Sequence, residues 1–428
     1  MHKVLIISYY WPPAGGPGVQ RWLKFVKYLP EFQIHPVVYI PENPKYPITD
    51  ISLSEEIPDQ VTIYKNKIFE PYHLAGFLSK NKTKQISAGI ISDHSPSFIE
   101  KMLLWIRGNL FIPDARKYWV KPSVSFLKDI INKEQIDTII TTGPPHSLHL
   151  IGLELKKIMD VKWLADFRDP WTSIGYHSKL RLSTASERKH RKLEKEVTNS
   201  CDRLLVTSKA TKAEFESITT KPIHVITNGY DIPESDLPFG ALDKKFTLSH
   251  IGSLLTGRNP ENLWKVLAEI IDENEAFRKA FQLNLIGVVG RDVLECIIDN
   301  GLKSYTNIKE YVSHKEAVNY QRSSQLLLLA EIDSPDTRGI IPGKLFEYLA
   351  AKRPILAIGP EDWEGAEIVK STNSGFVFNY NAVSDLKAVL LDWFYLYQQG
   401  NLMVSSKNIK AYNRKRLTAK LAELLAWE

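Results

Sequence analysis

Short apolar runs alternate with amphipathic stretches of helical spacing along the whole chain. Runs of this length, separated by helices, are typical of parallel sheets that are covered by helices. In the first half they predict strands at residues 4–9, 36–40, 61–65, 138–142, 163–167, 204–207 and 224–226. In the second half they predict strands at residues 247–251, 282–286, 308–311, 326–330, 354–358 and 375–378. The sequence therefore predicts an α/β fold.

The pattern breaks at residues 230–244 (YDIPESDLPFGALDK), where turn-forming residues replace any periodicity. We interpret this segment as a linker, because a chain of 428 residues is too long for one ordinary hydrophobic core. Ligands of open parallel sheets bind at the carboxyl ends of the strands. Two sheet domains that face each other across a cleft are therefore both expected to line it.

Residues 339–359 (GIIPGKLFEYLAAKRPILAIG) combine a helix start with a following strand. Gly343 lets a ligand approach the backbone N–H groups of the first helical turn, a place that attracts phosphate. Lys344 and Glu347 lie three residues apart, on a different side from the apolar stripe of the helix. We expect Lys344 to contact the phosphate and Glu347 the hydroxyl groups of a sugar nucleotide. The alternative is an amphipathic helix whose Lys–Glu pair is only solvated.

Composition narrows the class of protein. Hydrophobic residues at 43% and charged residues at 24% are typical of a soluble globular chain. The two cysteines, Cys201 and Cys296, lie far apart and predict neither a disulfide framework nor a zinc site. The apolar run of residues 4–7 is too short for a signal-peptide core, and no run reaches the roughly 20 residues of a membrane helix. A cytoplasmic location is expected, and a net charge of +6 is too small to imply nucleic-acid binding.

Several further motifs follow one another along the chain. They are KVLIISYYWPPAGGPGVQR at 3–21, TTGPPHS at 141–147, DFRDPW at 166–171, VTSKATKAEF at 206–215, ITNGYD at 226–231 and HIGSLLTGRNPENL at 250–263. Together with residues 339–359 they resemble the retaining GT-B glycosyltransferases of glycosyltransferase family 4. The resemblance implies two Rossmann-like, doubly wound domains facing across a cleft. It assigns acceptor binding to residues 1–235, donor binding to 236–405, and to 406–428 a helix that crosses back to the first domain.

The resemblance also implies an activity. Enzymes of this family move a sugar from a nucleotide-diphosphate donor, here a UDP- or GDP-sugar, to a glycan or lipid-linked acceptor. They act in the synthesis of bacterial surface polysaccharides and glycolipids. Retention of stereochemistry and transfer without metal are expected, and neither DxD nor HExxH occurs in the sequence. The nucleotide sugar is then a co-substrate, and no cofactor is expected.

The chain departs from the family at one position. Gly339 stands where the family usually carries the first of two glutamates, of which Glu347 is the second. Asp333 and Asp336 are candidates to replace the missing carboxylate. The departure leaves two alternatives open: a sugar-nucleotide 2-epimerase of the same architecture, and a degenerate scaffold without catalysis.

The donor site implied by the resemblance lies in the second half of the chain. Gly252, Ser253 and Arg258 follow its first strand, where the family places a basic pair against the diphosphate. Ser253 takes the usual arginine position, and Arg258 stands where a lysine is common. Arg258 and Lys344 are therefore expected to act in catalysis by neutralising the leaving diphosphate. Gly343, Leu345 and Glu347 complete the predicted donor contacts at the start of the helix.

The first half contributes a glycine-rich loop, residues 15–18, between a strand and a helix. The backbone at Gly16 and Gly18 is expected to approach the donor. A dinucleotide fingerprint is excluded, because GxGxxG begun at Gly16 meets Arg21 at the third glycine position. Arg21 is instead a candidate for binding an anionic acceptor. The alternative is a tight turn without a ligand.

Three residues are expected to bind the acceptor at the ends of the next strands. His146 begins a helix after residues 138–142, and the family places a histidine near the transferred sugar there. Arg168 and Asp169 end the strand 163–167, and Asp169 is a candidate general base toward the acceptor hydroxyl. The alternatives are a core histidine and an ion pair that caps a helix. His149 is a weaker candidate, and Asp166 is expected to be structural.

The segment 98–120 is rich in large apolar and basic residues and is a candidate for contact with the inner face of the cytoplasmic membrane. In that hypothesis the interfacial aromatic residues are Trp105, Phe111 and Trp119, and the residues near lipid phosphate are Lys101, Arg107, Arg116 and Lys117. The alternative is a pair of helices that face the core. The basic segment 179–195 is expected to be a solvated helix face.

Overall fold

The computed structural model describes residues 2–70, 98–175, 177–231 and 241–427. Its contacts divide the chain into two compact units, which we call the N-terminal unit (Met1–Asn228 with Arg414–Glu428) and the C-terminal unit (Gly229–Asn413). Most of the linker predicted at 230–244 falls on residues 232–240, which lie outside the described residues. Each unit contains a sheet of its own.

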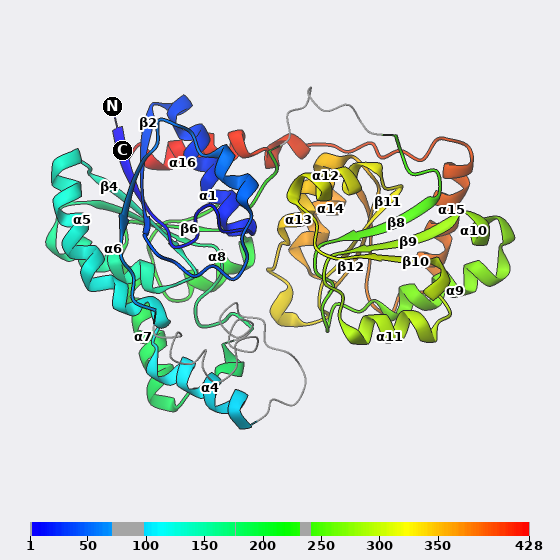
Figure 1. The fold of residues 1–428 in the computed structure, drawn as a ribbon, viewed down its shortest axis with the longest axis horizontal. Coiled ribbons are helices and arrows are strands. Elements are labelled where there is room, and N and C mark those ends of the chain that lie inside the picture. Colours follow the sequence, from blue (N-terminus) through cyan, green and yellow to red (C-terminus); the bar gives the residue numbers. More distant parts are fainter. Residues whose placement is uncertain (1, 71–97, 176, 232–240, 428) are drawn as a thin grey trace. The chain divides into compact units, whose positions relative to one another are not determined.

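The sheet of the N-terminal unit is parallel throughout. Within the described residues its strands are β1 (His2–Ile7), β2 (Ile34–Pro41), β3 (Thr62–Asn66), β4 (Thr138–Gly143), β5 (Lys162–Phe167), β6 (Arg203–Val206) and β7 (Ile223–Val225). They lie in the order β3-β2-β1-β4-β5-β6-β7 (Figure 1). The order reverses between β1 and β4, a switch point of the kind at which open α/β sheets bind ligands.

The sheet of the C-terminal unit is also parallel. Its strands within the described residues are β8 (Phe246–Ile251), β9 (Phe281–Ile286), β10 (Thr306–Lys309), β11 (Leu326–Ala330), β12 (Ile355–Ile358) and β13 (Gly375–Phe378). They lie in the order β10-β9-β8-β11-β12-β13. Here the switch point falls between β8 and β11.

The predicted fold class is confirmed: both units are Rossmann-like, with helices packed on a doubly wound parallel sheet. All thirteen predicted strands occur in the described part of the chain, with ends shifted by at most two residues. For the central strands the reason is that strands covered on both faces must be apolar along their whole length. Strand β11 is an example, since all of its residues are buried.

Helices cover both faces of the N-terminal sheet, because neighbouring residues of a strand point to opposite faces. Leu5 and Ile7 of β1 join one apolar core, and Val4 and Ile6 join the other. The described helices of this unit are α1 (Pro17–Tyr28), α4 (Phe98–Leu110), α5 (Val120–Glu134), α6 (Ser147–Ile158), α7 (Thr184–Ser200), α8 (Lys209–Glu216) and α16 (Arg414–Leu425).

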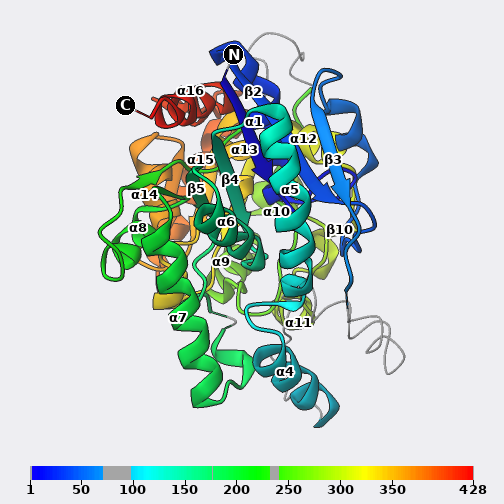
Figure 2. The ribbon, with the colours of Figure 1, turned by 90° about the vertical axis from the view of Figure 1, so that its left-hand side faces the viewer.

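The last helix, α16, belongs to the N-terminal unit although it follows the C-terminal unit in sequence. It lies beside α1 (Figures 1 and 2). Leu417, Leu421 and Leu425 recur every four residues along it and enter the core beneath α1. An apolar stripe of this spacing fixes which face of the helix is buried.

The C-terminal unit repeats the arrangement of helices on both faces of a sheet. Its described helices are α9 (Glu261–Glu273), α10 (Glu275–Ala280), α11 (Arg291–Asp299), α12 (His314–Ser323), α13 (Gly343–Ala351), α14 (Glu364–Ser371) and α15 (Ser384–Gln398). Neighbouring residues of its strands again point into two different apolar cores: Leu328 lies in one core and Leu327 in the other. Helix α13 contains Gly343 and Lys344, the residues for which the sequence predicts contact with phosphate.

The segment 98–120 is partly a core element, which corrects two of its predicted membrane contacts. Trp119 is 1% exposed and stacks on Tyr39, with ring centroids 4.9 Å apart. Arg116 is also buried, with its Nε 3.2 Å from Glu70 Oε1 and its guanidinium over the ring of Tyr9. Neither side chain can reach a lipid surface. Helix α4, in contrast, has an exposed face.

Arg21 is likewise a core residue, and the prediction that it binds the acceptor is wrong. Its guanidinium is fully buried, lies 3.2 Å from Asp166 Oδ1 and donates to the carbonyl of Thr227. The other carboxylate oxygen of Asp166 accepts from Trp22 Nε1 at 2.7 Å and from Thr142 Oγ1 at 2.9 Å. Asp166 therefore ties α1, β4 and β5 together inside the core.

Replacing Asp166 by alanine is expected to destabilise the N-terminal unit by about 3–5 kcal/mol, because the Arg21 charge stays buried without its partner. Urea denaturation followed by tryptophan fluorescence measures this loss. The control is Glu154→Ala, which removes an ion pair with Lys157 in which both side chains are 47% exposed. Exposed pairs contribute little. Equal midpoints for the two variants would contradict the proposed role of Asp166.

Candidate functional site

The N-terminal site is formed by loops at the carboxyl ends of β1, β4 and β5. These strands are neighbours in the sheet, so the loops that follow them lie at one edge. They carry the glycines at 16 and 18, His146, and the segment 168–171. The structure therefore brings together the predicted N-terminal site residues other than Arg21.

Gly18 and Arg168 are in direct contact. A Cβ atom at Gly18 would lie 1.5 Å from Arg168 Nη1, so glycine is required for the guanidinium to occupy its place. The Nε of Arg168 donates to the carbonyl of Gly143 at 3.2 Å, and its Nη2 donates to that of Pro144. Arg168 therefore holds the loop before His146, and its contact with an acceptor stays a prediction.

His146 is buried beside the aromatic side chain of Trp171. The two rings are parallel within 4°, with centroids 5.1 Å apart. Neither ring nitrogen of His146 has a hydrogen-bond partner among the described residues. Burial, followed by the charges of His149 and Arg168, holds the pKa of His146 well below its ordinary value. The imidazole is therefore neutral and offers one donor and one acceptor.

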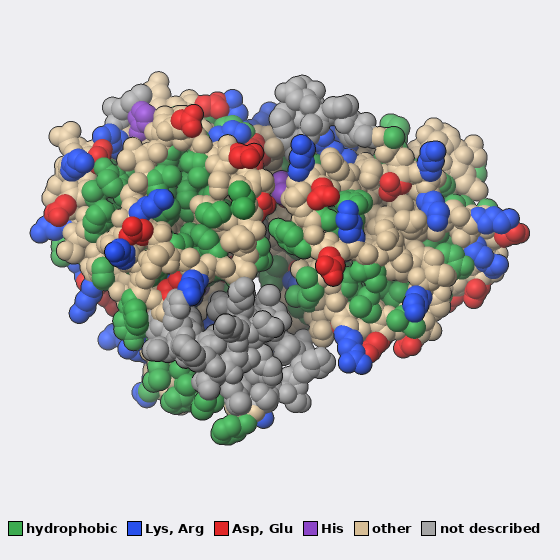
Figure 3. Space-filling model, viewed as in Figure 1, with side chains coloured by type: hydrophobic (Ala, Val, Ile, Leu, Met, Phe, Trp, Pro, Cys, Tyr) green, Lys and Arg blue, Asp and Glu red, His purple; other side chains and the backbone are tan. Residues whose placement is uncertain are grey.

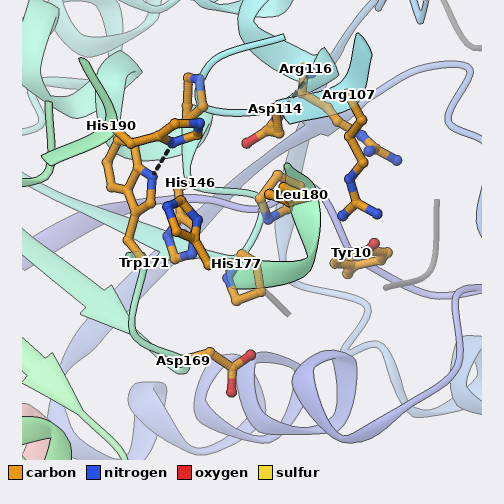
Figure 4. A pocket seen from close by; sticks show the side chains of 13 residues that line it. Tyr10, Arg107, Asp114, Arg116, His146, Asp169, Trp171, His177, Leu180 and His190 are labelled. Carbon is orange, nitrogen blue, oxygen red and sulfur yellow. Dashed lines mark hydrogen bonds between the residues drawn. The ribbon is translucent and has the colours of Figure 1, made fainter. Parts of the chain in front are cut away.

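Asp169 is another residue that lines the pocket of His146 (Figure 4). Burial raises the pKa of the Asp169 carboxyl, while the Arg168 charge opposes the rise. A carboxylate with a raised pKa takes up a proton more readily, which suits the predicted role of general base. The geometry is compatible with that role, which stays a prediction.

The pocket between these residues has a volume of about 190 Å³. Its lining includes aromatic and imidazole side chains that the sequence analysis did not select: Tyr10, Trp171, His177 and His190 (Figure 4). His190 lies in the basic segment expected to be solvated, yet it is 2% exposed. Most neighbours of His190 in the sequence are charged, so the sequence predicts that the whole helix is exposed. The spacing of His190 from Glu194 and Val197, which are also buried, becomes informative only once the structure shows which face of α7 is covered.

In the C-terminal unit, Gly252 and Lys344 meet at the switch point of the sheet. Gly252 has φ 108°, and a Cβ atom there would lie 2.9 Å from Lys344 Nζ. Lys344 Nζ lies 2.9 Å from Nε2 of His250, whose Nδ1 lies 3.0 Å from the carbonyl of Leu328. Burial and the Lys344 charge hold the pKa of His250 well below its ordinary value. His250 is therefore neutral, donates through Nδ1 and accepts from the lysine.

Arg258 is held by a carboxylate that the sequence analysis missed. Glu331 directly follows β11, is fully buried, and accepts from Arg258 Nε at 3.0 Å and Nη2 at 2.9 Å through Oε1. Its Oε2 has no partner among the described residues. Burial raises the pKa of Glu331, and the charge of Arg258 opposes the rise. Asp333 and Asp336, the candidates to replace the family glutamate, are exposed, and their role stays a prediction.

Glu347 is oriented by two residues of α12. His314 Nε2 lies 3.1 Å from its Oε1, and Gln321 Nε2 donates to its Oε2 at 2.7 Å. These two contacts fix the orientation of the carboxylate, and its predicted contact with ligand hydroxyls stays a prediction. Neither residue of α12 was selected from the sequence, because only the fold brings α12 beside α13.

The start of α13 provides backbone groups rather than side chains. Gly343 is its first residue, and Pro342 before it supplies no side-chain cap. The Leu345 side chain is fully buried, so only its main chain can approach a ligand. Ser253 is exposed after β8. The C-terminal site is thus a helix start flanked by two cations, Arg258 and Lys344.

Comparison with known proteins relates part of this chain to one family of enzymes. Residues 88–234 match the model of Glycosyltransferase Family 4. No curated protein sequence matches the chain significantly. The resemblance found in the sequence is confirmed over this segment: the chain contains a glycosyltransferase family 4 domain at residues 88–234, and the chain as a whole has the GT-B fold.

Solved structures with the same fold cover the chain almost completely. Sucrose-phosphate synthase from Thermosynechococcus elongatus is similar with a TM-score of 0.61 and 12% identity, over 99% of this chain and 98% of that chain. A TarM variant from S. aureus, in complex with Fondaparinux, alpha-GlcNAc-glycerol and UDP, has a TM-score of 0.58 and 13% identity, with both chains covered fully. UDP-GlcNAc 2-epimerase from Methanocaldococcus jannaschii has a TM-score of 0.53 and 12% identity, again with both chains covered fully. At these identities the likeness shows the fold alone.

Lys344 is expected to titrate near neutral pH in the ligand-free protein. Burial, with the Arg258 charge, lowers the pKa of Lys344 to about 7, so the ammonium loses its proton as the pH rises through this value. Anion binding through Lys344 should therefore weaken above pH 7. NMR titration of protein with ¹³C-labelled lysine measures the pKa. Inorganic pyrophosphate should raise it, because a nearby anion favours the charged form.

The NMR signal that is absent from the spectrum of the Lys344→Met variant is assigned to Lys344. In Glu331→Gln the pKa should fall further, since the Glu331 charge favours the ammonium. A lysine signal that titrates near the ordinary value of about 10.4 would refute the expected environment.

Proposed function

We propose that the C-terminal unit binds a nucleoside-diphosphate sugar and that the N-terminal unit binds the acceptor of the sugar. The observation that carries the proposal is the pair of cations, Arg258 and Lys344, beside the uncapped start of α13. Two cations and a helix start form a site for a strongly anionic group such as a diphosphate. The TarM relative, whose structure contains UDP, supports this ligand class.

In the proposed reaction the bond between the anomeric carbon and the donor phosphate breaks, and its electron pair leaves with the diphosphate. Arg258 and Lys344 stabilise the charge that develops there, an effect that commonly contributes about 2.7–4 kcal/mol per group. The acceptor hydroxyl forms the new bond on the same face of the sugar. Its proton passes to a donor phosphate oxygen or to Asp169. Glu347 binds the ribose hydroxyls.

Donor binding is expected to depend on Glu347. Thermal unfolding with UDP, GDP, CDP and ADP should show a selective rise in melting temperature, because a ligand of the native state stabilises it. Glu347→Ala should lose the rise, since a hydrogen bond to a charged group contributes about 1.5–3 kcal/mol. Glu361→Ala, which removes an exposed glutamate of the same unit, serves as the control. No shift with any nucleotide would refute the proposed donor site.

The 2-epimerase is the second candidate function, because a UDP-GlcNAc 2-epimerase shares the fold. It would convert the donor sugar without an acceptor, whereas a transferase releases the nucleoside diphosphate when an acceptor is present. NMR of the incubated donor distinguishes the two: inversion at C2 supports the epimerase and overturns transfer. The site favours transfer, because the N-terminal unit has a polar pocket beside a candidate base.

We further propose a lipid-linked acceptor in the synthesis of a bacterial surface polysaccharide or glycolipid, with α4 lying on the anionic membrane surface. Phe98, Met102 and Trp105 are 81%, 41% and 46% exposed and share one face of α4. A neighbouring face of α4 packs on the protein through Leu104 and Gly108. In Figure 3, hydrophobic side chains gather at the lower edge of the N-terminal unit, where Figure 1 places α4.

The charges around the exposed apolar face of α4 indicate which kind of membrane surface it would bind. The basic residues Lys101, Arg107 and Lys117 accompany the apolar stripe, and an apolar face flanked by cations fits anionic lipid. The membrane contact is peripheral in this proposal. None of the described helices is long and apolar enough to cross a bilayer.

The double variant Phe98→Glu with Trp105→Glu is expected to bind vesicles several-fold more weakly than the unaltered protein. Cosedimentation with vesicles of phosphatidylcholine and phosphatidylglycerol measures binding, which should also fall with added salt. Met403→Glu replaces a residue of the C-terminal unit that is 78% exposed and is the matched control. Unchanged binding of the double variant would exclude α4 as the contact.

A further inference from the structure

We propose that the pocket of the N-terminal unit is a subsite for one uncharged sugar ring of the acceptor, bound by His146 and His177. The proposal deepens the proposed function and rests on it, since it names the chemical class of the group that accepts the transferred sugar. Nothing in the sequence selected His177 or the wall behind it.

The first observation is a set of unpartnered buried nitrogens in one small cavity. His146 and His177 are 6% and 8% exposed, and both line the pocket (Figure 4). Both ring nitrogens of His146 and Nε2 of His177 have no hydrogen-bond partner among the described residues. Buried polar atoms are almost always paired in folded proteins. A ligand with hydroxyl groups would supply the missing partners.

The charge of the pocket favours an uncharged ligand. Two arginines, Arg107 and Arg116, and two aspartates, Asp114 and Asp169, line it. Arg116 is moreover paired with the buried Glu70, so the lining has no excess of positive charge to hold a phosphate. A neutral imidazole presents a donor and an acceptor, and a hydroxyl group complements both. A sugar hydroxyl therefore fits better than an anion.

The size of the pocket limits the ligand to a single ring. Its volume of about 190 Å³ is below the range of about 300–1,000 Å³ that encloses drug-sized ligands. One sugar ring is enclosed, and the rest of a glycan or lipid carrier must extend outward.

The wall behind the histidines is fixed by α7. His190 Nδ1 accepts from Trp171 Nε1 at 3.1 Å, and its Nε2 lies 3.3 Å from the carbonyl of Gly108. This pairing places the proton of His190 on Nε2. Glu194, one turn further along α7, accepts from the backbone N–H of Thr172 at 3.1 Å. Trp171 is thus held in place, and the His146 ring stacks on it. Such a preorganised wall reduces the entropic cost of binding.

The test is NMR of ¹⁵N-labelled histidine side chains in the full-length protein. The probes are the methyl glycosides of glucose, galactose, mannose and N-acetylglucosamine, with inorganic phosphate for comparison. At least one glycoside should shift the His146 and His177 signals saturably, while phosphate leaves them unchanged. In His177→Ala the apparent affinity for that glycoside should fall at least tenfold. His35→Ala, which alters a histidine of β2 away from the pocket lining, should leave it unchanged.

Two results would overturn the proposal: no glycoside shifts the pair of signals, or phosphate shifts them instead. Thermal stabilisation of the protein by UDP shows whether a negative result concerns only the sugar subsite or the proposed transferase function as well. If UDP still stabilises the unaltered protein, the donor site stands and only the sugar subsite fails. If a glycoside binds but no nucleotide does, the pocket stands and the transferase proposal fails. His177→Ala should retain the UDP shift, which shows that the variant is folded.

Discussion

The N-terminal unit depends on one buried carboxylate. Asp166 on β5 accepts hydrogen bonds from Arg21 and Trp22 of α1 and from Thr142 of β4. The strands β4 and β5 and the helix α1 are the elements whose loops carry the acceptor-side residues. A buried charge is tolerated only when its partners are complete, so the three elements must keep one arrangement. The position of the pocket above them follows from this constraint.

The C-terminal unit uses its carboxylates differently. Glu331 and Glu347 each lie at the ligand-binding end of the sheet, and each is fixed by a hydrogen-bond partner, Arg258 in one case and α12 in the other. Lys344 has a neutral partner, His250, instead of a carboxylate. The charges of Glu331 and Glu347 favour the Lys344 ammonium, but burial and the charge of Arg258 have larger, opposing effects on its pKa. Cations held rigidly and left partly uncompensated are suited to stabilise an anion without reorganisation.

The two units therefore present different chemistry at equivalent places in their sheets. Both sites lie at a switch point of a parallel sheet, as open α/β folds favour. One is lined by neutral imidazoles and balanced charges, and the other is cationic. This contrast is the physical basis for assigning hydroxyl groups to one unit and a diphosphate to the other. The fold alone would not make that assignment, because the same architecture serves several activities.

The sequence by itself determined the strands, the fold class and the loops that follow β1, β4, β5 and β8. The reason is local: apolar runs, glycine turns and helix starts depend on neighbours within a few residues. Only the tertiary structure decided which polar side chains are buried. Arg21 and Asp166 are 145 residues apart in the sequence, so no local pattern reveals their contact. His190 lies in a helix of mainly charged residues, and its contact with Trp171 is hidden from the sequence for the same reason. Glu331 was missed for the same reason, because its partner Arg258 belongs to another strand's loop.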